Sequence, residues 1–246
     1  MPPVIAPTDI CSRCNGTGWI PVSGDSLRVE ACGCQGELRR QQRLAAAGVP
    51  KRYFPHCTLD NFYTRDNGAL IASKRRIQEF IDAWTGGGSP GLLLMGGCGS
   101  GKTHLAVAAL IEIINSGKPG RMLFSNFQDL IQEIHASFGS DQVPTKSELL
   151  RPLLEVDLLV LDELGAQKPT TFVQDILYYV INTRYNEMLT TIFTTNYFDR
   201  PADPKEETLE NRVGARLRSR LSEMTEPIEL RNVPDFRRQR KAGNTL

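Results

Sequence analysis

A glycine-rich loop near the middle of the chain constrains the fold more than any other feature. The run Gly96-Gly-Cys-Gly-Ser-Gly-Lys-Thr103 matches the pattern G-x-x-x-x-G-K-[ST] in full. The pattern binds phosphate only after a strand and at the start of a helix, because loop N–H groups and the helix N-terminus act together. The sequence supplies an apolar segment at 92–95 and a helical pattern over 102–116. We therefore expect an α/β domain that binds nucleotide phosphates at this loop.

The residues of this loop have separate expected roles. Lys102 is expected to reach the β- and γ-phosphates, and the Thr103 hydroxyl to hold Mg²⁺. The remaining expected nucleotide contacts are Gly97, Cys98, Gly99, Ser100, Gly101 and His104. Cys98 stands at a variable position of the pattern, so a tolerated small residue is the favoured interpretation of it.

Strand and helix patterns alternate after the loop. The expected strands are 92–95, 122–124, 157–161, 191–195 and 227–230. The third of these is almost continuously apolar, which is typical of a parallel strand that is buried on both faces. Helical segments separate the strands, among them a single helix over 207–223. The alternation predicts a parallel sheet of five strands that is covered by helices.

Two acidic residues end the third expected strand. In Asp157-Leu-Leu-Val-Leu-Asp-Glu163, Asp162 is placed to hold Mg²⁺ and Glu163 to deprotonate the attacking water. Asn196 follows the next strand and is a candidate for positioning that water against the γ-phosphate. A plain turn-forming asparagine is the alternative for Asn196.

Arginines recur in the segment that is expected to be helical over 207–223. Arg212, Arg216 and Arg220 are spaced four apart and would share one face of a continuous helix. Such a row can stabilise charge on the γ-phosphate of a neighbouring subunit. A solvated basic face is the alternative, and the pattern alone favours it.

Four of the six cysteines lie in one short N-terminal stretch. The pairs Cys11/Cys14 and Cys32/Cys34 are separated by 17 residues, and four thiolates on two tight turns suit tetrahedral Zn²⁺. Residues 1–36 have little apolar surface to bury, so they need a cross-link such as a bound metal ion to fold. Free thiols, or disulfides formed on oxidation, are the alternative.

Composition excludes several broad classes. The formal net charge is +1, so the charge balance alone implies no nucleic-acid or membrane partner. No apolar run approaches the roughly 20 residues of a membrane-spanning helix. The N-terminus lacks the features of a secretory signal, so we expect a cytoplasmic protein.

Taken together, these motifs resemble the bacterial replicative-helicase loader ATPases, the AAA+ family of the DnaC and DnaI type, with the transposition helper IstB as a close relative. The resemblance is carried by residues 50–54, 59–62, the phosphate loop, 153–165, 184–186, 194–196 and 209–224. It implies an AAA+ P-loop three-layer fold around a central five-stranded parallel sheet. It also implies a zinc-binding segment with a linker helix over 1–48 and an ATPase domain over 49–246.

The resemblance implies roles for further residues. Asn196 becomes the sensor-1 residue and Arg220 the arginine finger, with Arg216 as second choice. Arg237 falls where such loaders place a sensor-2 arginine that touches the γ-phosphate of its own subunit. The segment 53–62 borders the adenine of bound ATP or ADP.

The resemblance also implies partners. These are further copies of the chain, in a hexamer or spiral, single-stranded DNA bound through an insertion within 126–152, and a DnaB-type replicative helicase engaged by the N-terminal segment. That segment is shorter than a full helicase-binding domain. One alternative is an IstB-like transposition ATPase that binds duplex DNA. Another is a zinc-stabilised adaptor with little turnover, against which the pair Asp162-Glu163 argues.

Overall fold

The computed structural model describes residues 11–14, 17–22, 25–137, 145–203 and 205–241, and its centre is one parallel sheet. The strands of this sheet are β3 (Gly91–Gly96), β4 (Met122–Asn126), β5 (Leu158–Asp162), β6 (Thr190–Thr195) and β7 (Thr225–Leu230). Their order is β4-β5-β6-β3-β7, and every neighbouring pair is parallel. Every residue of β3, β5 and β6 is buried. The predicted five-stranded parallel sheet is confirmed.

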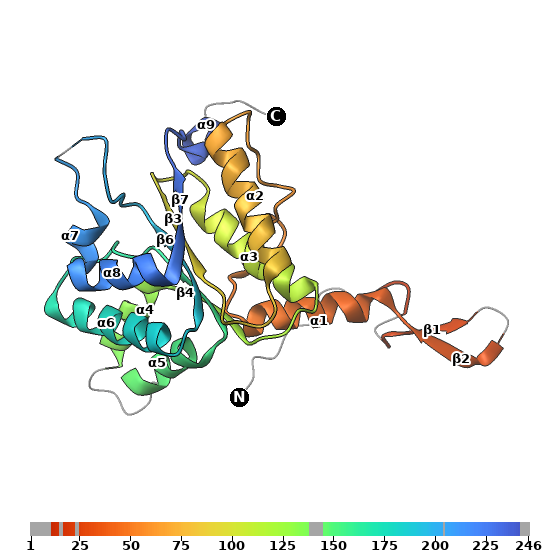
Figure 1. The fold of residues 1–246 in the computed structure, drawn as a ribbon. Coiled ribbons are helices and arrows are strands. Elements are labelled where there is room, and N and C mark those ends of the chain that lie inside the picture. Colours follow the sequence, from red (N-terminus) through yellow and green to blue (C-terminus); the bar gives the residue numbers. More distant parts are fainter. Residues whose placement is uncertain (1–10, 15–16, 23–24, 138–144, 204, 242–246) are drawn as a thin grey trace.

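Helices cover both faces of the sheet (Figure 1). They are α2 (Gly68–Ala83), α3 (Lys102–Asn115), α4 (Phe127–Ala136), α5 (Lys146–Glu155), α6 (Thr171–Asn186), α7 (Leu209–Val213) and α8 (Ala215–Met224). Alternate side chains of each strand point to opposite faces. In β3, Leu92 and Leu94 belong to the core under α2 and α3, whereas Leu93 and Met95 belong to the core under α4 to α8. The molecule therefore has the three layers that the sequence predicts.

The N-terminal segment is a hairpin followed by a helix. Strands β1 (Trp19–Val22) and β2 (Asp25–Ala31) pair antiparallel, and α1 (Gly33–Ala46) starts two residues later. Figure 1 shows the hairpin at the end of α1 that lies away from the sheet. The other end of α1 joins the core, where Leu44 is fully buried and the carbonyl of Ala47 accepts from the N–H of Phe124 at 2.7 Å. The sequence analysis did not predict this hairpin.

The helix predicted over 207–223 is wrong as a single element. Gly214, with φ 85° and ψ 149°, divides it into α7 and α8. Because the helix axis changes there, Arg212 does not continue the row of Arg216 and Arg220. Arg212 instead donates to the carbonyls of Gly165 and Gln167, both at 2.8 Å, and so ties α7 to the turn after β5.

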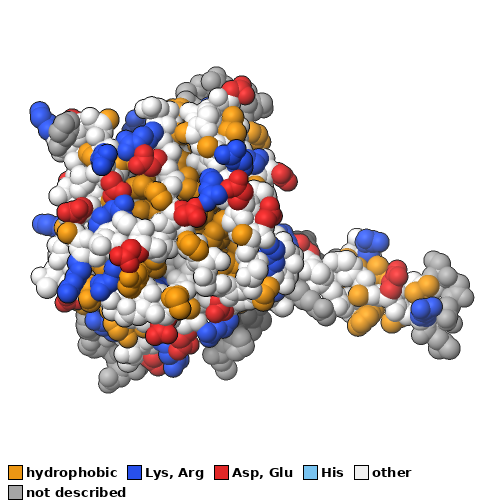
Figure 2. All heavy atoms as spheres, viewed as in Figure 1, with side chains coloured by type: hydrophobic (Ala, Val, Ile, Leu, Met, Phe, Trp, Pro, Cys, Tyr) orange, Lys and Arg blue, Asp and Glu red, His pale blue; other side chains and the backbone are white. Residues whose placement is uncertain are grey.

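Two short elements complete the described chain, a 3-10 turn at Lys51–Tyr53 and α9 (Phe236–Lys241). Figure 2 shows acidic and basic side chains interspersed over one face of the molecule, in keeping with the formal net charge of +1. No helix in the described ranges has the length and apolar character that crossing a bilayer demands.

Candidate nucleotide-binding site

A cleft of about 680 Å³ lies at the carboxyl ends of the parallel strands. The loop from Cys98 to His104 forms one end of it, and Glu163, Asn196 and Arg237 line it as well. Gly97 is the exposed residue that precedes this lining, and Asp162 contacts the cleft through Thr103. The structure therefore gathers in one place the residues that the sequence predicts for phosphate and Mg²⁺.

Glycines give the loop its shape. Gly99 and Gly101 have φ of 70° and 100°, a region that side chains other than glycine rarely adopt. A Cβ at Gly101 would lie 2.6 Å from a ring carbon of Phe62. Helix α3 starts directly after Gly101, so its first N–H groups open toward the cleft. The hydroxyl of Ser100 is buried with no hydrogen-bond partner among the described residues.

Lys102 is a buried cation at the floor of this loop. Its side chain is enclosed, with 7% of the residue exposed, and Nζ donates to the carbonyls of Gly96 and Gly97, both at 2.8 Å. Burial lowers the pKa of Lys102 to about 8. Two neutral carbonyls only partly offset the cost of burying a cation. An anion at this point would be stabilised by Lys102, and the residues present therefore fit a phosphate.

Asp162 is a buried carboxylate beside the loop. Its Oδ1 accepts from the hydroxyls of Thr103 at 2.8 Å and Thr194 at 2.6 Å. Burial raises the pKa of Asp162, an effect that the two hydroxyls partly oppose. A divalent cation would reverse this balance, because hard oxygen donors are the ligands that Mg²⁺ prefers. Thr103 and Asp162 thus offer a fitting donor set for Mg²⁺.

Glu163 is held at the edge of the cleft by a strained turn. Its φ is 61°, and its backbone N–H donates to the Thr194 hydroxyl at 3.0 Å. Its Oε2 accepts from the side-chain amide of Asn126 at 3.2 Å. Non-glycine residues with such φ values persist where neighbouring contacts fix them, and they cluster at functional sites.

Asn126 is a site residue that the sequence analysis missed. It ends β4, pairs in register with Asp162, and caps α4 through its side-chain oxygen. The signal that marked Asn196, an asparagine directly after a strand, was also present at Asn126. The predicted strand stopped two residues short, at 124, and so Asn126 was not recognised as a residue at the end of a strand.

The arginines that were assigned to the γ-phosphate lie in two different places. Arg237 lines the cleft. Arg220 lies outside the cleft lining on α8, where its guanidinium is 5.0 Å from the ring centroid of Tyr178 and 5.6 Å from that of Tyr185. Arg216 lies 5.5 Å from the same Tyr178 ring. This arginine–tyrosine cluster lies outside the cleft lining of its own chain, and Nη1 of the half-buried Arg220 is enclosed with no hydrogen-bond partner among the described residues.

Aromatic residues also line the cleft, and one of them packs against the phosphate loop. Tyr53, Phe62 and Tyr63 line it from the connector between α1 and α2. The ring of Phe62 meets the ring of His104 edge-on, at 5.4 Å between centroids. His104 Nε2 lies 2.8 Å from the carbonyl of Thr58, and burial lowers the pKa of His104. His104 therefore fixes the connector against α3, and its polar atom is already bonded to the protein.

The four N-terminal cysteines form a compact cluster. Their sulfur atoms all lie within 4.8 Å of one another, and none forms a disulfide. The Sγ atoms are 3.8 Å apart in Cys11/Cys32 and 3.4 Å apart in Cys14/Cys34. Four sulfurs at zinc-binding distance from a tetrahedral ion lie about 3.8 Å from one another. The cluster has the composition and the size of a metal site.

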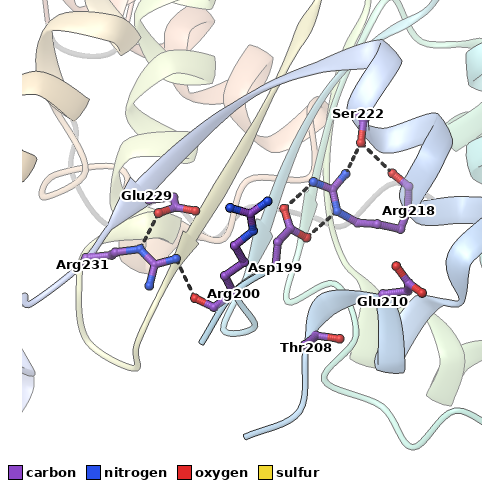
Figure 3. A pocket seen from close by; sticks show the side chains of 8 residues that line it. All are labelled: Asp199, Arg200, Thr208, Glu210, Arg218, Ser222, Glu229 and Arg231. Atoms are coloured by element: carbon purple, nitrogen blue, oxygen red, sulfur yellow. Dashed lines mark hydrogen bonds and ion pairs between the residues drawn. The ribbon is translucent and has the colours of Figure 1, made fainter. Parts of the chain in front are cut away.

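A second pocket, of about 810 Å³, lies beside α7, α8 and β7 (Figure 3). Three carboxylates and three guanidiniums line it, so their charges cancel. Arg218 forms an ion pair with Asp199, and Arg231 forms one with Glu229. Arg231 also lies over the ring of Phe198, 4.3 Å from its centroid. Internal pairing leaves this pocket without the buried, carbonyl-bonded cation that marks the first cleft.

Comparisons with known proteins agree with this geometry. Residues 35–203 match the family model described as IstB-like ATP binding protein. The replicative helicase loader DnaC of Buchnera aphidicola subsp. Acyrthosiphon pisum is 28% identical over 162 residues, which are 65% of this chain and 63% of that protein. DnaC of Escherichia coli strain K12 is 27% identical over 162 residues, 65% of this chain and 62% of that protein. The matches thus span less than two thirds of these curated relatives.

Solved structures of helicase loaders are also similar to this chain. A crystal structure of the DnaC helicase loader has a TM-score of 0.60 and 31% identity, covering 73% of this chain and 99% of that one. The crystal structure of DnaI also has a TM-score of 0.60, at 24% identity, covering 73% of this chain and 93% of that one, and it supports the fold alone.

Proposed function

The chain belongs to the IstB-like ATP-binding protein family, and from this premise we propose that it is an ATPase of the helicase-loader type. The observation that carries the proposal is Lys102, a buried cation bonded to neutral carbonyls at the floor of the phosphate loop. The pair Thr103 and Asp162 lies beside it, and Glu163 stands at the cleft edge. These are the parts that phosphoryl transfer to water requires.

The proposed reaction divides among these side chains. Lys102 and the first N–H groups of α3 bind the β- and γ-phosphates of ATP. Thr103 and Asp162 would hold Mg²⁺, which would supply positive charge to neutralise the charge that develops during phosphoryl transfer. Glu163 accepts the proton of the attacking water, and Asn126 restrains the Glu163 carboxylate through its amide. Asn196 and Arg237 line the same cleft and would contact the γ-phosphate.

Arg220 is proposed to act on a neighbouring copy of the chain. It lies outside its own cleft, on the arginine–tyrosine cluster. An arginine supplied in this way stabilises transition-state charge. Mixing Arg220→Ala with Lys102→Ala subunits tests this role. Each variant alone should be inactive, and the mixture should recover part of the activity at interfaces that combine an intact Arg220 with an intact cleft. An Arg220→Ala protein that hydrolyses ATP like wild type contradicts the role.

Zinc is the proposed occupant of the Cys11, Cys14, Cys32 and Cys34 cluster, where it would be structural. We propose the division into residues 1–48 and 49–246, with α1 as the rigid connection between them. Elemental analysis of protein purified under reducing conditions should find one zinc per chain. Metal-free protein that retains the hairpin signals in NMR spectra would contradict a structural zinc.

The proposed partner is a DnaB-type replicative helicase, met in the cytoplasm by the N-terminal segment, with assembly of several copies on single-stranded DNA. The relatives that carry the name replicative helicase loader support this choice. The proposed DNA-binding insertion within 126–152 contains α4 and part of α5, and its residues 138–144 lie outside the described residues. The alternative is an IstB-like transposition ATPase on duplex DNA, which the family description supports.

Pull-down with the tagged full chain separates the two partners. Capture of a replicative helicase with ATP supports the loader, and capture of a transposase supports the alternative. Fluorescence anisotropy with single-stranded and duplex oligonucleotides of equal length gives an independent answer. Tighter ATP-dependent binding to the single strand is expected, and a preference for duplex DNA would contradict the loader proposal.

A further inference from the structure

Two segments far apart in the sequence make contact in the lining of the candidate nucleotide cleft. The guanidinium carbon of Arg65 lies 5.1 Å from the ring centroid of Phe236. Both residues line the same cleft as the phosphate loop. A guanidinium over an aromatic face is attracted by the negative face of the ring. The pair therefore joins the turn before α2 to the start of α9 within the cleft lining.

The Arg65 side of this contact is a strained turn. Arg65 and Asp66 have φ of 46° and 56°, so two successive non-glycine residues adopt the left-handed region. The N–H of Asn67 donates to the carbonyl of Thr64 at 2.8 Å, and the Asn67 side chain caps α2. Strained residues of this kind persist where the surroundings fix them, and they cluster at ligand clamps.

The Phe236 side is attached to the phosphate loop. The N–H of Phe236 donates to the carbonyl of Gly99 at 3.2 Å. A Cβ at Gly99 would lie 1.9 Å from Oδ1 of Asp235, which accepts from the N–H of Arg237 at 2.9 Å. The C-terminal turn therefore lies directly against the loop. Through Phe236, Arg65 is connected to the element that binds phosphate.

We propose that Arg65 and Phe236 are a gate that must part before an adenine nucleotide enters or leaves the cleft. This inference rests on the proposed nucleotide-binding function. The separation of 5.1 Å leaves no room for a purine between the two groups, because atoms in contact need about 3.5 Å on each side of the base. The nucleotide passes only when the pair opens.

The gate predicts a specific kinetic signature. The contact joins protein to protein, so weakening it raises the open fraction whether or not nucleotide is bound. Association and dissociation rates then rise together, and Kd changes less than either rate. A side chain that merely touched bound nucleotide would alter dissociation alone. An exposed cation–π pair predicts a rise of about 2- to 5-fold in both rates.

Stopped-flow fluorescence of mant-labelled ADP and the full chain tests the proposal. Arg65→Ala and Phe236→Ala should each raise both rates about 2- to 5-fold, and the double variant should add little more. Phe236→Trp keeps an aromatic face and should remain close to wild type. Arg231→Ala is the matched control, because Arg231 lies 4.3 Å over the Phe198 ring in the second pocket. It should leave both rates unchanged.

Each outcome is decisive. Unchanged rates in Arg65→Ala and Phe236→Ala, or a rise in dissociation alone, overturn the gate while the ATPase proposal stands. Wild-type protein that fails to bind mant-ADP overturns the nucleotide-binding function itself. Circular dichroism melting monitors the fold of each variant, and Arg65→Lys keeps the test valid if Arg65→Ala does not fold. Lysine retains the charge and loses the planar stacking, so intermediate rates are expected.

Discussion

A buried cation lies at each end of the parallel strands, and the two cations differ in what surrounds them. At the carboxyl ends of the strands, Lys102 donates to two carbonyls of its own loop. At the amino ends of the strands, Arg184 is fully buried and makes four hydrogen bonds, to the hydroxyl of Thr191 and to the backbone carbonyls of Leu153, Val156 and Thr190. Burial lowers both pKa values, that of Lys102 to about 8 and that of Arg184 to about 10.

The difference separates a proposed binding group, Lys102, from a structural one, Arg184. Arg184, on α6, donates to the end of α5 and to the start of β6, and so holds these three elements together. Lys102 faces a cleft and keeps bonding capacity for a ligand. Substitutions in the cleft, at the carboxyl ends of the strands, should therefore lower activity with little effect on stability. Substitutions of Arg184, at the amino ends, should lower stability with little effect on activity per folded molecule.

The largest effect is expected from Glu163→Gln. Removing a general base lowers the rate of the catalysed step by about 10²- to 10⁴-fold. ATP hydrolysis should fall by that factor, while the affinity for ATP and the melting temperature should stay near wild type. A coupled ATPase assay and calorimetric melting check this. Glu187→Gln, on the exposed end of α6, is the matched control. Hydrolysis that survives in Glu163→Gln contradicts the assignment of the base.

The next largest effect is expected from Arg184→Met. Methionine fills much of the volume and leaves several buried carbonyls without a donor, which costs about 1–3 kcal/mol for each group. We expect the free energy of unfolding to fall by about 3 kcal/mol or more. Urea denaturation measures the loss. Nucleotide affinity per folded molecule should not change. A variant with normal stability and weak nucleotide binding would contradict a structural role for Arg184.

Lys102→Met should have the opposite profile. A hydrogen bond to a charged group contributes about 1.5–3 kcal/mol, so Kd for ATP should rise about 10- to 100-fold. Titration with mant-labelled ATP measures the change. Stability without nucleotide should be equal to wild type or higher, because the variant buries no cation. A large loss of stability would mean that Lys102 is structural, like Arg184.

The parts of the fold that the sequence predicted are those fixed by local chemistry. Gly99 and Gly101 sit at positive φ, and Lys102 opens α3, as the loop pattern requires. Unbroken apolar strands such as β5 can only be buried on both faces. These features depend on neighbours in the sequence, and so the phosphate loop and the acidic pair could be located without coordinates.

The parts that were missed depend on distant contacts. A glycine inside a helical pattern is often tolerated, so the break at Gly214 was not foreseen. Asn126 joins the site only because β4 lies beside β5 in register. The contact of Arg65 with Phe236 needs the C-terminal turn to lie on the phosphate loop. No local pattern encodes such pairings, which arise from the order of strands in the sheet.

The smallest expected effect is the pH dependence that Lys102 gives to stability without nucleotide. Burial lowers its pKa from 10.5 to about 8, so the charged form is disfavoured in the folded state. A lowered lysine pKa penalises folding at low pH, and the penalty fades as pH rises through the folded value toward the unfolded one. Wild type should therefore gain about 1 kcal/mol relative to Lys102→Met between pH 7 and pH 9. Urea titrations of both proteins at each pH measure this difference, which cancels the titration of other groups. A constant difference across this range would mean that the cation is already compensated, and the contrast between Lys102 and Arg184 would then fail.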